Sequence, residues 1–151
     1  IKQAIEAGAR IKLFGEGDVA AILACGFEDT GIDIFMGTGG APEGVIAATA
    51  MKCMGGEMQA QLVPHNQNEI DRCHKMGIED VNKIWTNDEL VKSDNVFFAA
   101  TAITECDLLK GIVFSKNETA KTHSIVMRSK TGTIRFTEAI HDLNKSKLVI
   151  E

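Results

Sequence analysis

A single carboxylate lies within a glycine-rich loop, Gly37-Thr38-Gly39-Gly40-Ala41-Pro42-Glu43-Gly44. Glycines allow close approach to backbone amides, and proline is favoured in the first turn of a helix, so the loop predicts open amides at a helix start. Such amides bind anions such as phosphate. Glu43 would repel a phosphate on the same amides unless a cation lay between them, which predicts a divalent metal ion. The alternative is that Glu43 only stabilises its own helix.

The spacing of this loop excludes the common nucleotide signatures. A dinucleotide fingerprint that starts at Gly37 requires glycine where Pro42 stands. A phosphate-cradling loop that starts at Gly39 requires Lys-Ser/Thr where Val45 and Ile46 stand. The chain also has no Gly-x-Ser-x-Gly motif, which argues against hydrolysis by a serine nucleophile.

A second acidic turn, Gly15-Glu16-Gly17-Asp18, precedes the apolar run 19–25. Asp18 has the residue type and position of a helix N-cap. The apolar stretches 10–14 and 32–36 are typical of strands, and each leads through a glycine turn into a helix. Successive strand–helix units favour a parallel sheet, whose carboxyl edge would join the two turns in one crevice. The residues expected there are Glu16, Asp18, Gly39, Gly40 and Glu43.

The rest of the chain alternates between helical and strand patterns. Helices are predicted at 1–7, 42–54 and 68–75, with a single turn at 87–91, and strands at 58–63, 95–101, 122–128 and 133–141. The apolar stretch 95–101 indicates a strand covered on both faces. The last two strands form a hairpin at 129–132, where nearby basic residues are either a solvated edge or a contact for phosphate or another subunit. Together the elements predict an α/β layered sandwich with a mainly parallel or mixed sheet flanked by helices.

Composition indicates one ordinary globular domain. The chain has 151 residues, is 44% hydrophobic and 25% charged, and carries a net charge of -5 with scattered basic residues, so neither nucleic acid nor an anionic membrane is an expected partner. No apolar run approaches the ~18 residues of a membrane span, and we expect a cytoplasmic protein. Reduced core thiols are expected because no Cys-x-x-Cys occurs among Cys25, Cys53, Cys73 and Cys106.

Five stretches that follow one another along most of the chain carry a family resemblance. They are 17–21, 37–44, 93–101, 107–111 and 126–135, and the Gly-Gly-Ala-Pro-Glu-Gly segment is the most specific of them. In these stretches the sequence resembles the carboxyl half of class II fructose-1,6-bisphosphatase, the metal-dependent bacterial type of the lithium-sensitive phosphatase superfamily. Glu16 departs from the family's usual aspartate, and Ala102 and Cys106 stand where the family commonly has glycine.

The resemblance implies hydrolysis of the 1-phosphate of fructose 1,6-bisphosphate to fructose 6-phosphate, a reaction of gluconeogenesis and glycerol metabolism. It implies Mn²⁺ or Mg²⁺ as cofactor, with Glu43 as a metal ligand and Gly40 as a backbone contact to the sugar phosphate. The family's acidic turn contacts the substrate, which carries over to Glu16, Gly17 and Asp18. No residue of this chain is assigned a catalytic role, and the intact protein is expected to be a homo-oligomer.

The resemblance also places most of the family's metal-binding carboxylates, including an Asp-Pro-Leu/Ile-Asp/Glu-Gly-Thr motif, before residue 1. We therefore expect residues 1–151 to be the carboxyl-terminal α/β half, without the amino-terminal metal-binding half and inactive alone, because a two-metal phosphatase needs several carboxylates. The alternatives are sedoheptulose 1,7-bisphosphate or an inositol phosphate as substrate, or a non-catalytic module that binds sugar phosphates.

Overall fold

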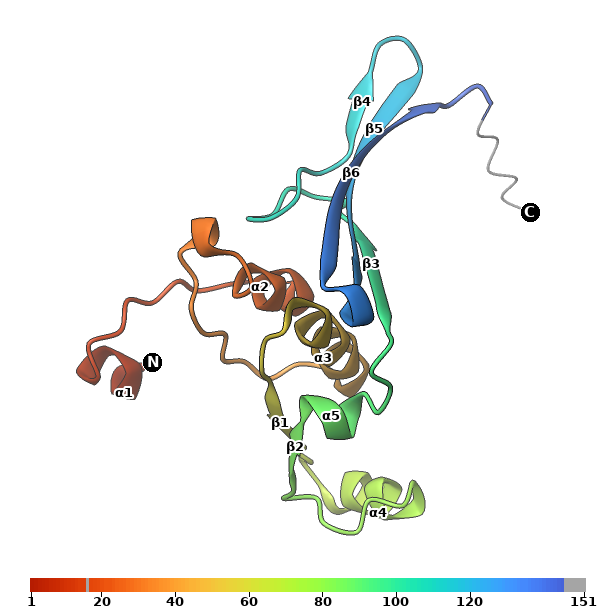
Figure 1. Ribbon diagram of the computed structural model, residues 1–151. Helices are drawn as coiled ribbons and strands as arrows, with labels where there is room; N and C mark the ends of the chain where they lie inside the picture. Colours follow the sequence, from red (N-terminus) through yellow and green to blue (C-terminus); the bar gives the residue numbers. More distant parts are fainter. Residues whose placement is uncertain (16, 146–151) are drawn as a thin grey trace.

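The computed structural model describes residues 1–15 and 17–145 and has the α/β class that the sequence predicts (Figure 1). Its helices are α1 (Lys2–Glu6), α2 (Asp18–Ala24), α3 (Ala41–Met54), α4 (Gln67–Lys75) and α5 (Asn87–Leu90), with 3₁₀ turns η1 (Glu28–Thr30) and η2 (Ser129–Thr131). Its strands are β1 (Gln59–Gln61), β2 (Ile84–Thr86), β3 (Phe97–Thr101), β4 (Val113–Ser115), β5 (Thr119–Arg128) and β6 (Thr133–Asp142).

The larger sheet is built around β5. The strand β6 pairs with β5 along its whole length, from Thr119 opposite Asp142 to Arg128 opposite Thr133. The other edge of β5 is shared by β3 and β4, which pair with its last and first residues respectively. The hairpin predicted at 129–132 is confirmed: η2 and Gly132, whose φ of 58° suits glycine, reverse the chain.

The core lies between this sheet and the helices α2 and α3. The middle of α3 is made of alanines without exposed surface, and such small residues let the helix lie close to its neighbours. Figure 1 shows α2 and α3 side by side next to the sheet. The buried residues that meet there are Leu23, Ala50, Cys53, Phe98, Leu109, Ile125 and Met127. Burial of these side chains is the main favourable contribution to folding.

A smaller unit extends from the carboxyl end of α3. Here β1 and β2 form a two-stranded antiparallel sheet. The helix α4 connects these two strands along the chain, and the Asn66 side chain caps it. A capping box between Thr86 and Glu89 begins α5, and Lys52 of α3 bonds to Asp88 of α5 at 2.9 Å. The elements predicted at 58–63, 68–75 and 87–91 are thereby confirmed.

Two sequence predictions of strands are wrong in the described chain. Residues 10–14 and 32–36 are extended but form no strand, because a strand requires a hydrogen-bonded neighbour and none pairs with them there. The expected parallel sheet is also absent among the described residues, where every strand pair is antiparallel. Leu13 and Ile34 are consequently about three-quarters exposed, at 74% and 75%.

Two further expectations need correction. Asp18 does not cap α2; Gly17 is the N-cap, with a φ of 90°, and Asp18 is the first helical residue. The strand β3 is covered on one face only, because Phe98 packs against the helices whereas Phe97, on the opposite face, is 64% exposed. The apolar composition of a strand therefore did not determine how many of its faces are buried.

The four cysteines are free thiols, as expected, and Cys53 and Cys73 are buried. Burial raises the pKa of the Cys25 and Cys53 thiols, which keeps them neutral and unreactive. Within the described part of the chain, no helix combines the length and the apolar character needed to cross a membrane.

Candidate functional site

The start of α3 brings a carboxylate over a glycine. Gly40 is the N-cap of this helix with an extended backbone, and Pro42 lies in the first turn. The Glu43 side chain folds back so far that a Cβ atom added to Gly40 would collide with its carboxylate. Glu43 therefore lies in the first turn of α3, against the positive end of the helix dipole, where acidic side chains are favoured.

The start of α2 contributes a second carboxylate to the same place. The positive φ of Gly17 turns the chain into α2 without a side-chain cap. The Asp18 carboxylate then reaches across to the α3 loop, where a Cβ atom added to Gly39 would collide with it. The structure thus brings the Asp18 side chain to the Gly39-Gly40 loop, although the expected reason was wrong: packing of α2 on α3 joins the two turns, not the edge of a parallel sheet.

The expected site residues differ in how well the structure places them. Asp18, Gly39, Gly40 and Glu43 gather where α2 and α3 begin. Glu16 lies outside the described residues. The side chains of Glu43 and Asp18 form no ion pair within the described chain; Glu43 is exposed and therefore accessible to a ligand, whereas Asp18 is half-buried.

The described residues do not fit a complete metal centre. In the part of the chain that the structure describes, no three His, Cys, Asp or Glu side chains are grouped closely enough to hold a metal ion. Mg²⁺ takes six oxygen ligands, some of them waters, and a pair of metal ions needs several carboxylates. Glu43 can supply one ligand, and a metal ion at this position would need others.

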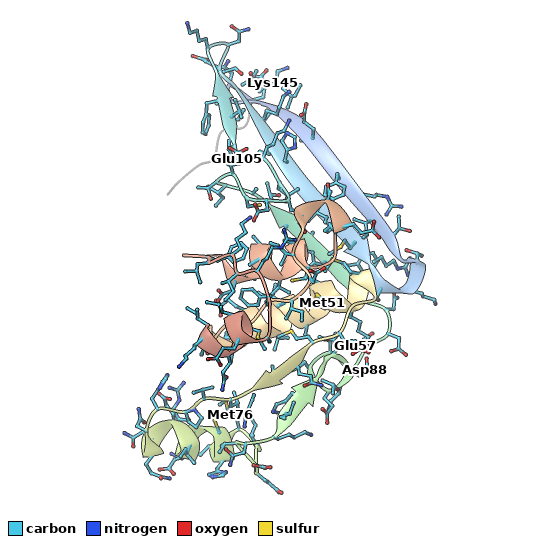
Figure 2. The ribbon with its side chains drawn as sticks, turned by 90° about the vertical axis from the view of Figure 1, so that its left-hand side faces the viewer. Met51, Glu57, Met76, Asp88, Glu105 and Lys145 are labelled. Carbon is cyan, nitrogen blue, oxygen red and sulfur yellow. The ribbon has the colours of Figure 1, made fainter. Side chains whose placement is uncertain are left out.

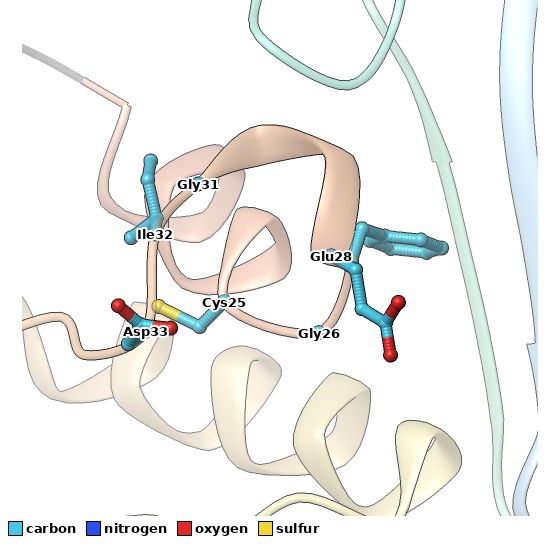
Figure 3. A pocket seen from close by; sticks show the side chains of 7 residues that line it. Cys25, Gly26, Glu28, Gly31, Ile32 and Asp33 are labelled. Atoms are coloured by element: carbon cyan, nitrogen blue, oxygen red, sulfur yellow. The ribbon is translucent and has the colours of Figure 1, made fainter.

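Two cavities lie near this region, and the sequence predicted neither. The first, of about 170 Å³, lies beside η1 and contains no expected site residue; Figure 3 shows the Cys25 sulfur close to the Asp33 carboxylate on one side of it and Glu28 on the other. The second, of about 260 Å³, adjoins Gly17. Most of the side chains that line this second cavity are apolar, including Val19, Leu23, Leu108 and Leu109.

Other polar residues around the larger sheet make structural contacts. Thr101 bonds to Ser124 across the sheet at 2.8 Å, and Asp107 accepts a bond from Lys12 at 2.7 Å. Arg128 donates to the Asn95 side chain at 2.9 Å and lies over a phenylalanine ring of β3. These contacts account for Thr101, Asp107 and Arg128 without a ligand.

A helix start offers backbone amides that can bind an anion such as phosphate, and at the start of α3 the Glu43 and Asp18 carboxylates lie against Gly40 and Gly39. A family model described as bacterial fructose-1,6-bisphosphatase, glpX-encoded, matches residues 1–141. The chain belongs to this family.

Curated relatives agree with this assignment. The chain is 42% identical to fructose-1,6-bisphosphatase class 2 of Haemophilus influenzae, over 95% of this chain and 46% of the relative. It is 38% identical to the D-fructose 1,6-bisphosphatase class 2/sedoheptulose 1,7-bisphosphatase of Crocosphaera subtropica, over 99% of this chain and 46% of the relative. The protein of the same name from Synechococcus sp. is 40% identical over 93% of this chain and 44% of its own. The chain thus spans slightly less than half the length of these relatives.

Proposed function

We propose that this protein takes part in hydrolysis of the 1-phosphate of fructose 1,6-bisphosphate, which yields fructose 6-phosphate and phosphate. The observation that carries the proposal is the Glu43 carboxylate folded over Gly40, with Asp18 against the neighbouring Gly39. The names of the matched family and relatives support the same reaction. A cytoplasmic, homo-oligomeric enzyme that works in gluconeogenesis and glycerol metabolism is part of this proposal.

Each residue of the cluster has a distinct proposed role. The amide of Gly40 donates to the sugar phosphate, aided by the α3 dipole. Asp18, with Glu16 and Gly17 of the same turn, contacts the substrate, where carboxylates accept hydrogen bonds from sugar hydroxyls. Glu43 supplies one ligand to Mn²⁺ or Mg²⁺, which would offset the repulsion between this carboxylate and the phosphate.

The remaining metal ligands are proposed to belong to the part of the family's polypeptide that this chain does not span. A bound divalent ion activates water and neutralises the phosphoryl group in enzymes of this kind. Because the described residues contain no group of metal ligands, we expect the 151-residue chain to release no phosphate by itself.

A chimera tests the proposal. In it, this chain replaces the matching segment of the Haemophilus influenzae relative, which supplies the remaining residues. We expect Mn²⁺-dependent phosphate release from fructose 1,6-bisphosphate by the chimera and none by the chain alone. Glu43→Gln should reduce the chimera's rate at least about 100-fold, since loss of a metal ligand removes transition-state stabilisation of several kcal/mol.

The matched control is Glu57→Gln. Glu57 is an exposed glutamate beyond the carboxyl end of α3 (Figure 2), ~20 Å along the helix from Glu43. This variant should keep the full rate, and both variants should keep the unfolding temperature of the unchanged chimera. An active chimera that tolerates Glu43→Gln would refute the role of Glu43. Metal-independent binding of fructose 6-phosphate by an inactive chimera would support a non-catalytic module instead.

A second substrate is favoured by the relatives' names. Two of the three relatives are named as sedoheptulose 1,7-bisphosphatases as well. Both sugars present a phosphate on a terminal carbon, so the Gly40 amide and Asp18 would bind them alike. Values of kcat/KM for the two bisphosphates, measured on the chimera, would show which sugar the site prefers.

A further inference from the structure

The loop between β3 and β4 is closed by its own hydrogen bonds and lies beside the start of α2. The Ile112 amide donates to the Ile103 carbonyl at 3.0 Å and so joins the two ends of the loop. Inside it, the Cys106 amide donates to the Leu109 carbonyl at 3.0 Å, and the Leu109 amide donates to the Cys106 sulfur at 3.3 Å. Residues of this loop line the apolar cavity next to Gly17, so the loop adjoins the turn that begins α2.

Asp107 lies within this loop and bonds to the segment that leads into α2. It accepts a bond from the Lys12 Nζ atom at 2.7 Å, although the two residues are 95 positions apart in the chain. The same Nζ atom lies 5.4 Å from the centre of the Phe14 ring. Both side chains of the ion pair are partly exposed, at 53% for Lys12 and 37% for Asp107, and such a pair adds little to stability. What the pair does is fix the position of this segment against a loop of defined shape.

A pair of aromatic rings joins the same segment to the glycine-rich loop. The rings of Phe14 and Phe35 meet edge to face, with their centroids 6.5 Å apart. These two side chains are half-buried, whereas every other described residue of 10–15 and 33–39 is exposed. The Phe35 ring also lies against Gly37, where an added Cβ atom would be 2.8 Å from the ring's Cζ atom. The rings thus connect the chain that leads into α2 with the chain that leads into α3.

We propose that the Asp107–Lys12 pair and the two rings together set the spacing between the turn that begins α2 and the loop that begins α3. This inference rests on the proposed function, in which Asp18 of the turn and Gly40 of the loop bind the same sugar phosphate. A displacement of about 1 Å in a binding group can cost as much as 100-fold in rate, so a small change in this spacing is sufficient. The ion pair and the rings are positioning groups and do not themselves contact the substrate.

Neutral variants of the ion pair in the Haemophilus chimera separate positioning from a direct effect of charge. Asp107→Asn and Lys12→Met should each lower kcat/KM for fructose 1,6-bisphosphate about fivefold, the most that an exposed ion pair contributes. The double variant should lose no more than either single variant, because both remove the same contact. Charges that acted directly on the anionic substrate would have opposite effects, so Asp107→Asn would raise kcat/KM. Opposite effects, or unchanged values in both single variants, would overturn the proposal.

Two further variants serve as controls for the ion pair. Lys12→Arg keeps the cation and should retain most of the activity. Asp142→Asn removes an exposed carboxylate that pairs with Lys145 at 3.5 Å, at the end of β6, which lies away from the starts of α2 and α3 (Figure 1). This variant should keep the full kcat/KM. A loss in Asp142→Asn as large as that in Asp107→Asn would overturn the proposal, because any exposed carboxylate would then have the same effect.

The ring pair is tested by Phe35→Leu in the same chimera. This variant should lower kcat/KM about tenfold, the upper limit of what an edge-to-face pair contributes. The matched control is Phe114→Leu, since Phe114 of β4 is 70% exposed and belongs to neither segment. It should keep the full kcat/KM, and equal values for the two variants would overturn the proposal.

Glycine amide spectra test the same coupling without substrate or metal. The chain has 14 glycines, so labelling glycine alone with ¹⁵N gives a spectrum simple enough to assign. In the 151-residue chain, Asp107→Asn should shift the cross peaks of Gly15, Gly17 and, through the rings, Gly37, whereas Asp142→Asn should leave them in place. Unmoved cross peaks in Asp107→Asn would overturn the proposal. Shifted cross peaks together with a chimera that releases no phosphate would support the positioning and refute the proposed function instead.

Discussion

The β5–β6 hairpin and the segments 10–15 and 33–39 share an apolar, strand-like sequence but differ in structure. Paired along its full length, β5 has Ile125 and Met127 completely buried. The two segments have neither strand pairing within the described chain nor a covered outer face. Both regions have strand-forming side chains, so the difference lies in whether the described chain supplies a pairing neighbour.

This difference illustrates that strand formation depends on a pairing neighbour. The hairpin closes through a bend of a few residues, and the entropy lost in closing such a short loop is small. Parallel strands need a crossover connection and often a neighbour from a distant part of the chain. A segment with strand-like alternation therefore forms a strand only where a neighbour pairs with it, either in a hairpin or, as for β1 and β2, across a longer connection.

Alanine substitutions at one isoleucine in each region should differ most strongly in their effect on the free energy of unfolding. Ile125→Ala should lower the free energy of unfolding of the 151-residue chain by about 3 kcal/mol, because it removes fully buried methylenes and leaves a cavity. Ile34→Ala should lower it by less than about 0.5 kcal/mol, because that side chain is mostly exposed. Urea titration measures both values.

The same pair of variants in the chimera sharpens the comparison. If an added layer covers the second segment there, Ile34→Ala should cost more than about 1 kcal/mol, as partly buried isoleucines do. If Ile34→Ala leaves the free energy of unfolding of the chimera almost unchanged, Ile34 stays exposed there. The rest of the polypeptide then does not cover this segment.

Glycine substitutions test the start of α3, the helix that follows the segment 33–39 and packs against β5. A Cβ atom at Gly39 or Gly40 would displace the Asp18 or the Glu43 carboxylate respectively. Gly40→Ala should therefore lower kcat/KM of the chimera at least about tenfold, equivalent to ~1.4 kcal/mol. Gly44→Ala is the matched control: its Cβ atom would meet open space in a helical backbone, so activity should persist and stability should rise slightly. Equal activity of the two variants would argue against a crowded carboxylate at Gly40.

The sequence predicted the local elements of the fold well. Helices at 42–54 and 68–75 and the hairpin at 129–132 follow from periodicity and glycine positions, and the structure contains all three. Strand pairing at 10–14 and 32–36 could not be predicted, because it depends on a neighbour and not on the segment's own residues. Covering of β3 on one face likewise depends on what packs against the sheet.

The site could be predicted in its residues more than in its geometry. The Gly-Gly-Ala-Pro-Glu-Gly segment indicated Gly40 and Glu43, and acidic residues beside glycines indicated Asp18. The contact between Asp18 and Gly39 arises from the packing of α2 on α3, which no local pattern specifies. The apolar cavity beside Gly17 is formed by residues from α2, β3 and the loop after it, and only the fold brings these together.

The smallest expected effect is at Glu138 in the hairpin. A hydrogen bond from Lys121, at 2.8 Å, lowers the pKa of the Glu138 carboxyl group below its ordinary value of 4.5. The charges of Lys121, His123 and Lys110 act in the same direction. A lowered folded-state pKa stabilises the protein above the ordinary pKa, and this stabilisation is lost as the pH falls through the folded-state pKa. Glu138→Gln should therefore lower the Tm slightly at pH 7, and this difference should disappear once the pH lies below the folded-state pKa, where both states bind the proton. Since the pair is exposed, the difference should also shrink in 1 M salt, where the Debye length is about 3 Å. A Tm difference that does not shrink with falling pH or in high salt would show that Glu138 supports the hairpin through packing and not through its charge.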